Sequence, residues 1–494
     1  MPSRNRWLVL AIVSSALLLI TIDMTVLYTA LPTLTRALHA SASEKLWIVN
    51  AYALVLAGLL PGFGALGDKY GPKVMFLFGL AVFGAASTVA AFAPSPEVLI
   101  GARVLLAIGA AAMMPATLSI IRHAFEDEKE RSIALGVWAS VSAGGAAFGP
   151  VLGGLLLEHF WWGSVFLINT PIILIAFVIG LVVIANHKSD HGQPLDILGS
   201  LQIMIGLISV VLAIKEVAKQ NSSWLLAAAA LVIGVAFILA FVRRQLQAAA
   251  PMIDFSLFRN PNFTAAVVVA LVSLAALVGL ELVLSQRLQL VVGLSPLEAG
   301  LFILPIPLSA VVAGPMVGVI IPRVGSQPVL WTGLLLSGLG VGLLLATYSS
   351  GATWQVVSFI MLGFGIGAAM SAASNAIMLN APVERAGMAA SIEEVSFELG
   401  GALGVAILGS VMSAAYARFI LLPAGLEVPA NVRDSLDEAL MAAEKLAPGP
   451  AALLAELSRN AFNHAFVAVL AVASAALIAT ALGVALFGRN RTPQ

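Results

Sequence analysis

The sequence predicts an all-α membrane protein that crosses the bilayer many times. Of its 494 residues, 60% are hydrophobic and only 10% are charged, whereas a soluble domain carries about 25% charged residues. The apolar residues come in repeated blocks of about 20 residues, the length at which a helix spans the hydrocarbon core of a bilayer. Helices are expected because every backbone polar group in lipid has to be paired within its own segment.

Fourteen membrane-spanning helices are expected from these blocks. They cover about 7–34, 45–66, 74–93, 96–122, 131–158, 164–185, 195–217, 222–243, 261–290, 296–320, 328–348, 352–380, 385–417 and 459–487. Turn-forming pairs such as Gly71-Pro72 and Asn260-Pro261 separate them. Most Lys and Arg residues of the loops fall on the side of the N-terminus, which predicts that both termini are cytoplasmic.

Fourteen spans divide as six, two and six. We expect a first six-helix bundle over 1–190, two inserted helices over 191–250, and a second bundle over 251–494 that includes an outer loop at 418–458. The stretches 64–71 and 314–325 end corresponding spans of the two bundles and look distantly alike, as in repeat-built transporters. Within the outer loop, 435–446 is predicted to form an amphipathic helix.

The composition also excludes several classes of function. The chain has no cysteine, its net charge is zero, and its six histidines lack metal-ligand spacing. No GxxxxGK[ST] sequence occurs, and no nucleophile–base set is recognisable. We therefore expect no enzyme activity, no cofactor, no metal and no nucleic-acid partner.

The strongest local pattern is a glycine-rich run in the fifth predicted span. Small residues four apart let another helix approach closely, and a proline inside a helix permits a bend. The run consists of Gly145, Gly149, Pro150, Gly153 and Gly154. Ordinary tight packing between helices is the alternative interpretation of such a pattern.

This run matches GxxxGPxxGG, the antiporter motif of drug exporters in the major facilitator superfamily. Three further segments resemble signatures of that superfamily. They are the cytoplasmic loop with Gly64, Asp68, Lys69, Gly71 and Lys73, the first-span stretch 23–32, and Arg103 followed by Gly109. The whole chain is similar to the fourteen-span drug:proton antiporters, in particular to the methyl viologen and quaternary-ammonium exporters. Tyr28, Pro72, Ala107 and the stretch 162–164 depart from the usual residues.

Four acids within predicted spans are candidates for binding protons and cationic substrate. Charges inside a membrane are costly and usually functional. Asp23 lies in the first span, and Glu393, Glu394 and Glu398 lie in the thirteenth. Glu394 and Glu398 share a helix face, and neighbouring carboxylates favour a state in which one of them holds a proton. Structural pairing is the alternative for Asp23, and for Glu393 in particular, which could pair with Arg385.

Arg103 keeps its positive charge under all ordinary conditions, so within the membrane it needs an acid or carbonyl groups as partners. The resemblance implies that it couples proton binding to conformational change, and a structural ion pair is the alternative. Flat cations stack on aromatic rings, which makes Tyr28, Tyr52, Trp138 and Phe397 candidates for the pocket. Glu281 is placed near the outer end of the ninth span, where it is expected to meet water.

The resemblance implies a major facilitator fold of two six-helix bundles plus two inserted helices. It also implies a monomeric antiporter of a bacterial inner membrane, driven by the proton gradient, that exports lipophilic mono- and dications. Its expected partners are cationic drugs, protons and membrane lipid, and the loop at 64–73 would help to close the cytoplasmic mouth. Export of a native metabolite or lipid, with drug efflux incidental, is the alternative function.

Overall fold

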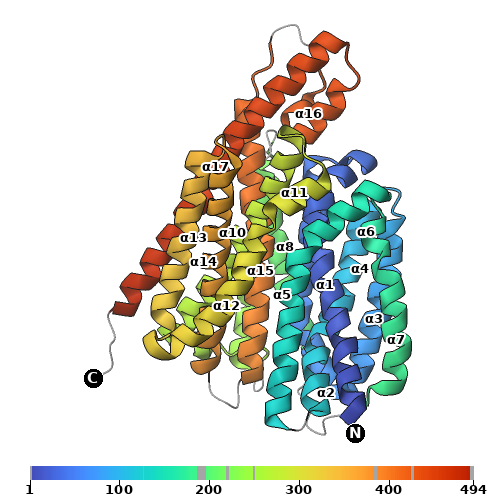
Figure 1. Ribbon diagram of the computed structural model, residues 1–494, viewed down its shortest axis with the longest axis vertical. Coiled ribbons are helices and arrows are strands. Elements are labelled where there is room, and N and C mark those ends of the chain that lie inside the picture. Colours follow the sequence, from blue (N-terminus) through green and yellow to red (C-terminus); the bar gives the residue numbers. More distant parts are fainter. Residues whose placement is uncertain are drawn as a thin grey trace.

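In the computed structural model the chain is a long bundle of helices (Figure 1). The structure describes residues 3–125, 127–185, 196–217, 222–248, 251–381, 386–423 and 428–489, and within these ranges it contains helices and no strands. Thirteen of the helices are long and apolar enough to cross a membrane. The predicted span that is not among these thirteen, 131–158, is the 32-residue helix α5. The predicted multi-span helical fold is therefore confirmed.

The first half of the protein comprises α1 to α7. These helices are α1 (Ser3–Leu38), α2 (Ala42–Tyr70), α3 (Pro72–Ala91), α4 (Pro96–Ala124), α5 (Glu128–His159), α6 (Ser164–Leu167) and α7 (Asn169–Val183). Gly71 ends α2 with a φ of 96°, a backbone conformation that glycine adopts readily, and Pro72 then begins α3.

Two helices, α8 (Ile197–Val217) and α9 (Trp224–Gln247), stand between the halves in the sequence. Asp196 fixes their ends together, because it accepts a hydrogen bond from the Gly199 N–H and forms an ion pair with Arg244 at 2.8 Å. α8 packs against both α2 and α15, where Leu207 and Val211 share a hydrophobic cluster with Leu54 and Ala402. The helix α8 therefore covers one seam between the halves.

The second half comprises the remaining helices. They are η1 (Phe255–Arg259), α10 (Pro261–Gln286), η2 (Arg287–Val291), α11 (Pro296–Ile303), α12 (Pro305–Val324), α13 (Ser326–Thr347), α14 (Ala352–Leu379), α15 (Ala386–Phe419), η4 (Ala430–Arg433), α16 (Leu436–Ala443) and α17 (Pro448–Arg489). Each half has its own hydrophobic core, with Phe83 and Leu106 in the first and Phe359 and Phe466 in the second.

Several helix boundaries differ from the predicted ones. The sixth predicted span is broken at Ile168, and the tenth is broken before Pro305, which has no N–H to continue the helix. The last helix begins at Pro448 rather than near 459, because the stretch that follows is rich in Ala and Leu, which favour helix. The predicted outer loop is therefore shorter, and it contains the predicted amphipathic helix as α16, capped by Ser435.

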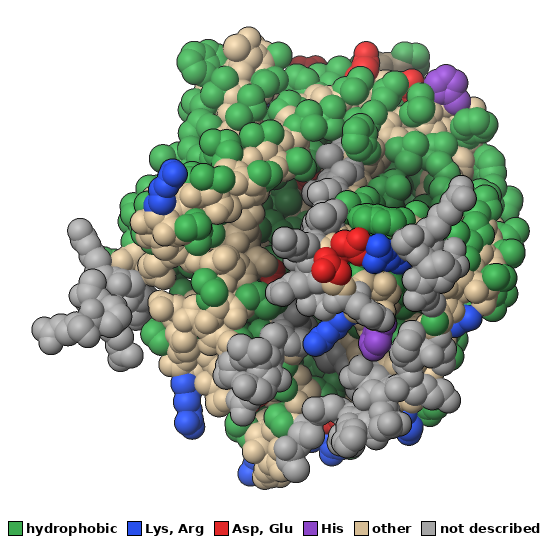
Figure 2. All heavy atoms as spheres, turned by 60° about the horizontal axis from the view of Figure 1, so that its bottom comes forward, with side chains coloured by type: hydrophobic (Ala, Val, Ile, Leu, Met, Phe, Trp, Pro, Cys, Tyr) green, Lys and Arg blue, Asp and Glu red, His purple; other side chains and the backbone are tan. Residues whose placement is uncertain are grey.

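Both chain ends lie at the same end of the bundle, which we call the proximal end; α16 lies at the opposite, distal end (Figure 1). Figure 2 shows the proximal face, which is hollowed near its centre. The distal end, in contrast, is bridged by contacts between the halves that are described below.

Candidate functional site

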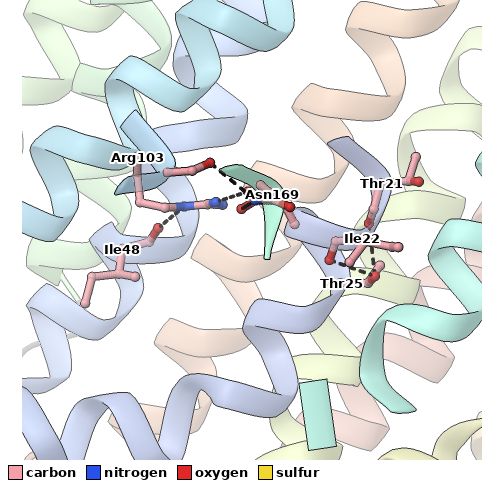
Figure 3. Close-up of polar contacts among 8 residues, drawn as sticks. Thr21, Ile22, Thr25, Ile48, Arg103 and Asn169 are labelled. Atoms are coloured by element: carbon pink, nitrogen blue, oxygen red, sulfur yellow. Dashed lines mark hydrogen bonds and ion pairs between the residues drawn. The ribbon is translucent and has the colours of Figure 1, made fainter. Parts of the chain in front are cut away.

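Asp23 of α1 and Arg103 of α4 form a buried ion pair inside the first half. Figure 3 shows Arg103 with its neighbours Ile48 and Asn169. Nη1 of Arg103 lies 2.5 Å from Oδ2 of Asp23, and the two side chains are 2% and 0% exposed. Removing one partner of such a pair leaves an uncompensated buried charge. The structure thus joins two residues that the sequence singled out separately.

The Arg103 guanidinium has two further contacts, both with α2. Its Nε donates a hydrogen bond to the carbonyl of Ile48 at 3.1 Å, and its Cζ lies 4.4 Å from the centre of the Tyr52 ring. The Tyr52 side chain is 1% exposed and its hydroxyl has no hydrogen-bond partner among the described residues. Tyr52 therefore stacks on the protein's own cation.

Asn169 is a functional candidate that the sequence analysis missed. Its Nδ2 lies 3.3 Å from Oδ1 of Asp23 and 3.3 Å from Oγ of Ser87, and all three side chains are fully buried. The amide thus binds one oxygen of the carboxylate, and Arg103 binds the other. The sequence feature that could have identified Asn169 is a single amide side chain in a strongly apolar span, at the first residue after the break at Ile168.

The three acids of α15 have different neighbours, because Glu393 faces the second half and Glu398 faces the first half. Glu393 is 9% exposed and faces the Ser374 hydroxyl of α14, within the second half. Glu394 is half-buried, and Glu398, 6% exposed, interacts electrostatically with Glu394 and with Arg103 of the first half. Oε2 of Glu398 has no hydrogen-bond partner among the described residues. The Arg385 proposed as a partner of Glu393 lies outside the described residues.

The candidate aromatic residues do not form one pocket wall. Tyr28 is 7% exposed and lies within electrostatic reach of Arg103 and Glu398, between the halves. Trp138 donates a hydrogen bond from Nε1 to Thr117 of α4 at 3.2 Å, and Phe397 packs against the core of the second half. Tyr28 and Tyr52 thus lie at the charge cluster, and the contacts of the other two are with their own halves.

The glycine-rich run on α5 contacts both halves. Gly145 and Gly149 face Thr21 and Thr25 of α1, and Gly153 faces Val26. On the next face, Gly154 lies against the backbone of Leu297 in α11, and Gly300 of α11 lies against the carbonyl of Pro150. The run therefore serves close packing, first within the first half and then across the seam to the second.

Replacing Gly149 with alanine should destabilise the protein by about 1–3 kcal/mol, the cost of overpacking a tight contact. A Cβ at this position would collide with Oγ1 and Cβ of Thr25. Thermal unfolding of the purified protein in detergent measures the change. Gly101→Ala in α4 is the matched control, because nothing lies within 4 Å of a Cβ there; equal shifts for both variants would contradict the prediction.

The predicted cytoplasmic loop lies at the junction of α2 and α3. Nζ of Lys73 donates to the carbonyl of Leu181 in α7 at 2.7 Å, and the ammonium of Lys69 lies 5.4 Å from the centre of the Tyr70 ring. Gly64 faces Pro115 at van der Waals distance. The side chain of Asp68 lies outside the described residues. The contacts of these lysines that the structure describes are within the first half.

Contacts between the halves close the distal end. Lys45 of α2 forms a buried ion pair with Asp437 of α16, with side chains 7% and 5% exposed, and it also donates to Gln286 of α10 at 3.1 Å. The Ala42 N–H donates to Oε1 of Glu438 at 3.1 Å. Burial raises the pKa of the Glu438 carboxyl. An exposed pair, Arg36 and Glu444, adds a further bridge at 2.9 Å.

Comparison with known proteins decides the family. The model of the Major Facilitator Superfamily matches residues 13–405 and 280–491. The chain belongs to the major facilitator superfamily. Its members are transporters, so the expectation that the chain is a transporter and not an enzyme is confirmed, as is its multi-pass membrane character.

Within the superfamily, the chain is similar to named drug exporters. It is 41% identical over 482 residues to the methyl viologen resistance protein SmvA of Salmonella typhimurium, covering 97% of each chain. It is 37% identical to the multidrug efflux pump LfrA of Mycolicibacterium smegmatis, covering 97% of this chain and 95% of LfrA. A tetracenomycin C resistance and export protein of Streptomyces glaucescens is 30% identical, with 99% and 92% covered. The predicted resemblance is confirmed.

A solved structure has the same major facilitator fold. The bacterial homologue of the human lysosomal transporter Spinster, in an inward-facing and unoccupied conformation, matches with a TM-score of 0.67 over 100% of both chains. Its sequence identity of 18% limits the likeness to the fold.

Proposed function

We propose that this chain is a proton-coupled antiporter that exports lipophilic mono- and dications, such as quaternary ammonium compounds, methyl viologen, dyes and biguanide-type antiseptics. It would work by alternating access in a bacterial inner membrane, as a monomer with both termini in the cytoplasm and without a cofactor. The names of the relatives support drug export. Proton coupling is proposed mainly because of the buried ion pair between Asp23 and Arg103. This pair lies within electrostatic reach of Glu398 on the second half, and one oxygen of the Glu398 carboxylate has no hydrogen-bond partner among the described residues.

The geometry supports a coupling step. A proton bound by Asp23 removes the negative charge that holds Arg103, whereas Arg103 keeps its own charge. The guanidinium, already within electrostatic reach of Glu398, then attracts the second half more strongly. A cationic substrate at Glu394 and Glu398 competes with protons and with Arg103 for the same carboxylates. Proton and substrate occupancy thereby favour different arrangements of the halves.

The test is dye efflux in everted vesicles or proteoliposomes under an imposed pH gradient, with wild type and Asp23→Asn compared. Uphill transport of ethidium or methyl viologen by wild type, and its loss in the variant, is the expected result. If wild type moves neither cation while a neutral metabolite follows the gradient, the proposal fails and only the family assignment stands.

Replacing Glu394 or Glu398 with glutamine should reduce dication transport more than monocation transport. A monocation needs one favourable carboxylate, whereas a dication gains from two, so the variant should lose about tenfold in apparent affinity for methyl viologen, equivalent to about 1.4 kcal/mol. Concentration dependence of methyl viologen and ethidium transport measures both. Glu393→Gln is the control, because Glu393 faces α14. Equal losses for both substrates would count against two-carboxylate binding.

A further inference from the structure

Glu281 of α10 is a buried acid that the mechanism above does not use. The sequence predicts that it meets water at the outer end of its span, but in the structure its side chain is only 8% exposed. The cause lies in tertiary packing, because every residue from Val278 to Gln286 is buried and this part of α10 packs against the first half. Among the described residues, no hydrogen bond or ion pair to its carboxylate is found, although carboxylates in membranes usually have a partner.

The face of α10 that carries Glu281 looks toward α1 of the first half. Val278 and Leu282, one turn apart, pack into the core cluster of the first half. Further along, Nε2 of Gln289 donates to the carbonyl of Thr29 at 2.9 Å. Glu281 lies within this stripe, since residues three and four apart share a helix face. The Tyr28 hydroxyl of α1 interacts electrostatically with the Glu281 carboxylate.

The packing of α10 against α15 sets the separation between Glu281 and Glu398. Gly404 lies against the backbone of Ala275, and Gly279 lies against Gly404 and the side chain of Leu408. In this parallel register, Glu281 is level with the turn around Leu408, about ten residues beyond Glu398. At 1.5 Å per residue, the backbone positions of Glu281 and Glu398 are separated by about 15 Å along the bundle axis. Tyr28 lies within electrostatic reach of both acids.

We propose that Glu281 and Glu398 form a two-carboxylate site for elongated organic dications, in which Glu281 binds the second cationic centre. This inference rests on the proposed export of lipophilic cations. A dication whose charges are about 15 Å apart can pair with both carboxylates at once, given 1.5 Å of rise per residue between them. A monocation, or a dication with a short spacer, reaches only one of these two carboxylates, Glu281 or Glu398. Glu281 is thus a specificity-determining residue for long substrates.

The test uses competition with ethidium transport in proteoliposomes. The competitors are two bis(trimethylammonium) alkanes, one with a ten-methylene and one with a six-methylene spacer, and dodecyltrimethylammonium as an apolar monocation. Wild type should bind the ten-methylene compound about tenfold more tightly than the six-methylene one, a difference of about 1.4 kcal/mol. Glu281→Gln should remove this difference and leave inhibition by the monocation unchanged. Glu456→Gln, an exposed acid on α17, is the matched control and should behave as wild type.

If Glu281→Gln keeps the spacer preference, the inference is overturned, because Glu281 then binds no substrate. If the folded variant also loses the binding of ethidium and of the monocation, the inference is overturned as well, because Glu281 then acts on every substrate. Retained ethidium transport shows that the variant is folded; if it is not folded, Glu281→Asp takes its place, and its optimum should move to a longer spacer. A wild type that transports no cation would overturn the proposed function itself, which separates the two failures.

Discussion

Replacing Arg103 with glutamine is expected to cost about 3–5 kcal/mol of stability, as found when one partner of a buried ion pair is removed. It should also abolish transport driven by the pH gradient. The Asp23 carboxylate is 0% exposed, and without the guanidinium it keeps only the amide of Asn169 as a polar partner among the described residues. The loss should therefore be seen as a lower unfolding temperature in detergent.

The double variant Asp23→Asn with Arg103→Gln separates folding from coupling. With both charges removed, no buried charge is left unpaired, so most of the lost stability should return, whereas transport should not. Unfolding temperatures of the two single variants and the double variant form a thermodynamic cycle for the pair. Additive losses would show that Asp23 and Arg103 do not depend on each other, and recovered transport would show that neither carries the coupling.

Replacing Asp437 with asparagine is expected to open the distal end of the protein more often. Lys45 and Asp437 are both nearly fully buried, so the variant leaves the Lys45 ammonium with the Gln286 side chain as its described polar partner. An unpaired charge in such a place favours a state in which water reaches it. The closed arrangement should therefore lose population relative to the open one.

The chain has no cysteine, so a single introduced thiol reports this opening without background. Ser413 lies beneath α16, beside Lys45 and Ser435, and Ser413→Cys should react with a membrane-impermeant maleimide at least about tenfold faster when Asp437 is asparagine, corresponding to about 1.4 kcal/mol. Glu444→Gln is the control, since its pair with Arg36 is exposed and such pairs contribute about 0–1 kcal/mol. Equal labelling rates in the two variants would contradict a special role for the buried pair.

The sequence allowed the fold to be predicted because its signal is strong at the scale of whole spans. Apolar blocks and turn residues located each helix, and the motif at Gly145–Gly154 pointed to the family before any geometry was known. The break at Ile168 and the early start of α17 were not predicted. Within a continuous apolar or helix-forming stretch, local propensity and packing decide where a helix begins and ends.

The site was predicted only in part, because partners depend on tertiary packing. Asp23 and Arg103 were recognised as costly charges, but 80 positions separate them, and nothing local indicates that they meet. Asn169 carries no charge, so its burial in a span does not by itself indicate a functional residue. Glu281 was misjudged because its burial depends on the packing of α10 against the first half, where Val278 and Leu282 join the core cluster, and nothing local in the sequence indicates that contact.

The seam between α5 and α11 contains two contacts that are made by backbone, since Gly154 lies against the Leu297 main chain and Gly300 lies against the Pro150 carbonyl. At these two points the helices can part and meet again without a glycine side chain having to regain a rotamer. The entropy lost each time they rejoin is therefore small, because glycine has no side-chain freedom to give up. Under the proposed alternating access, this seam would be broken and re-formed in each transport cycle, and glycine contacts would keep the side-chain entropy lost on closing small.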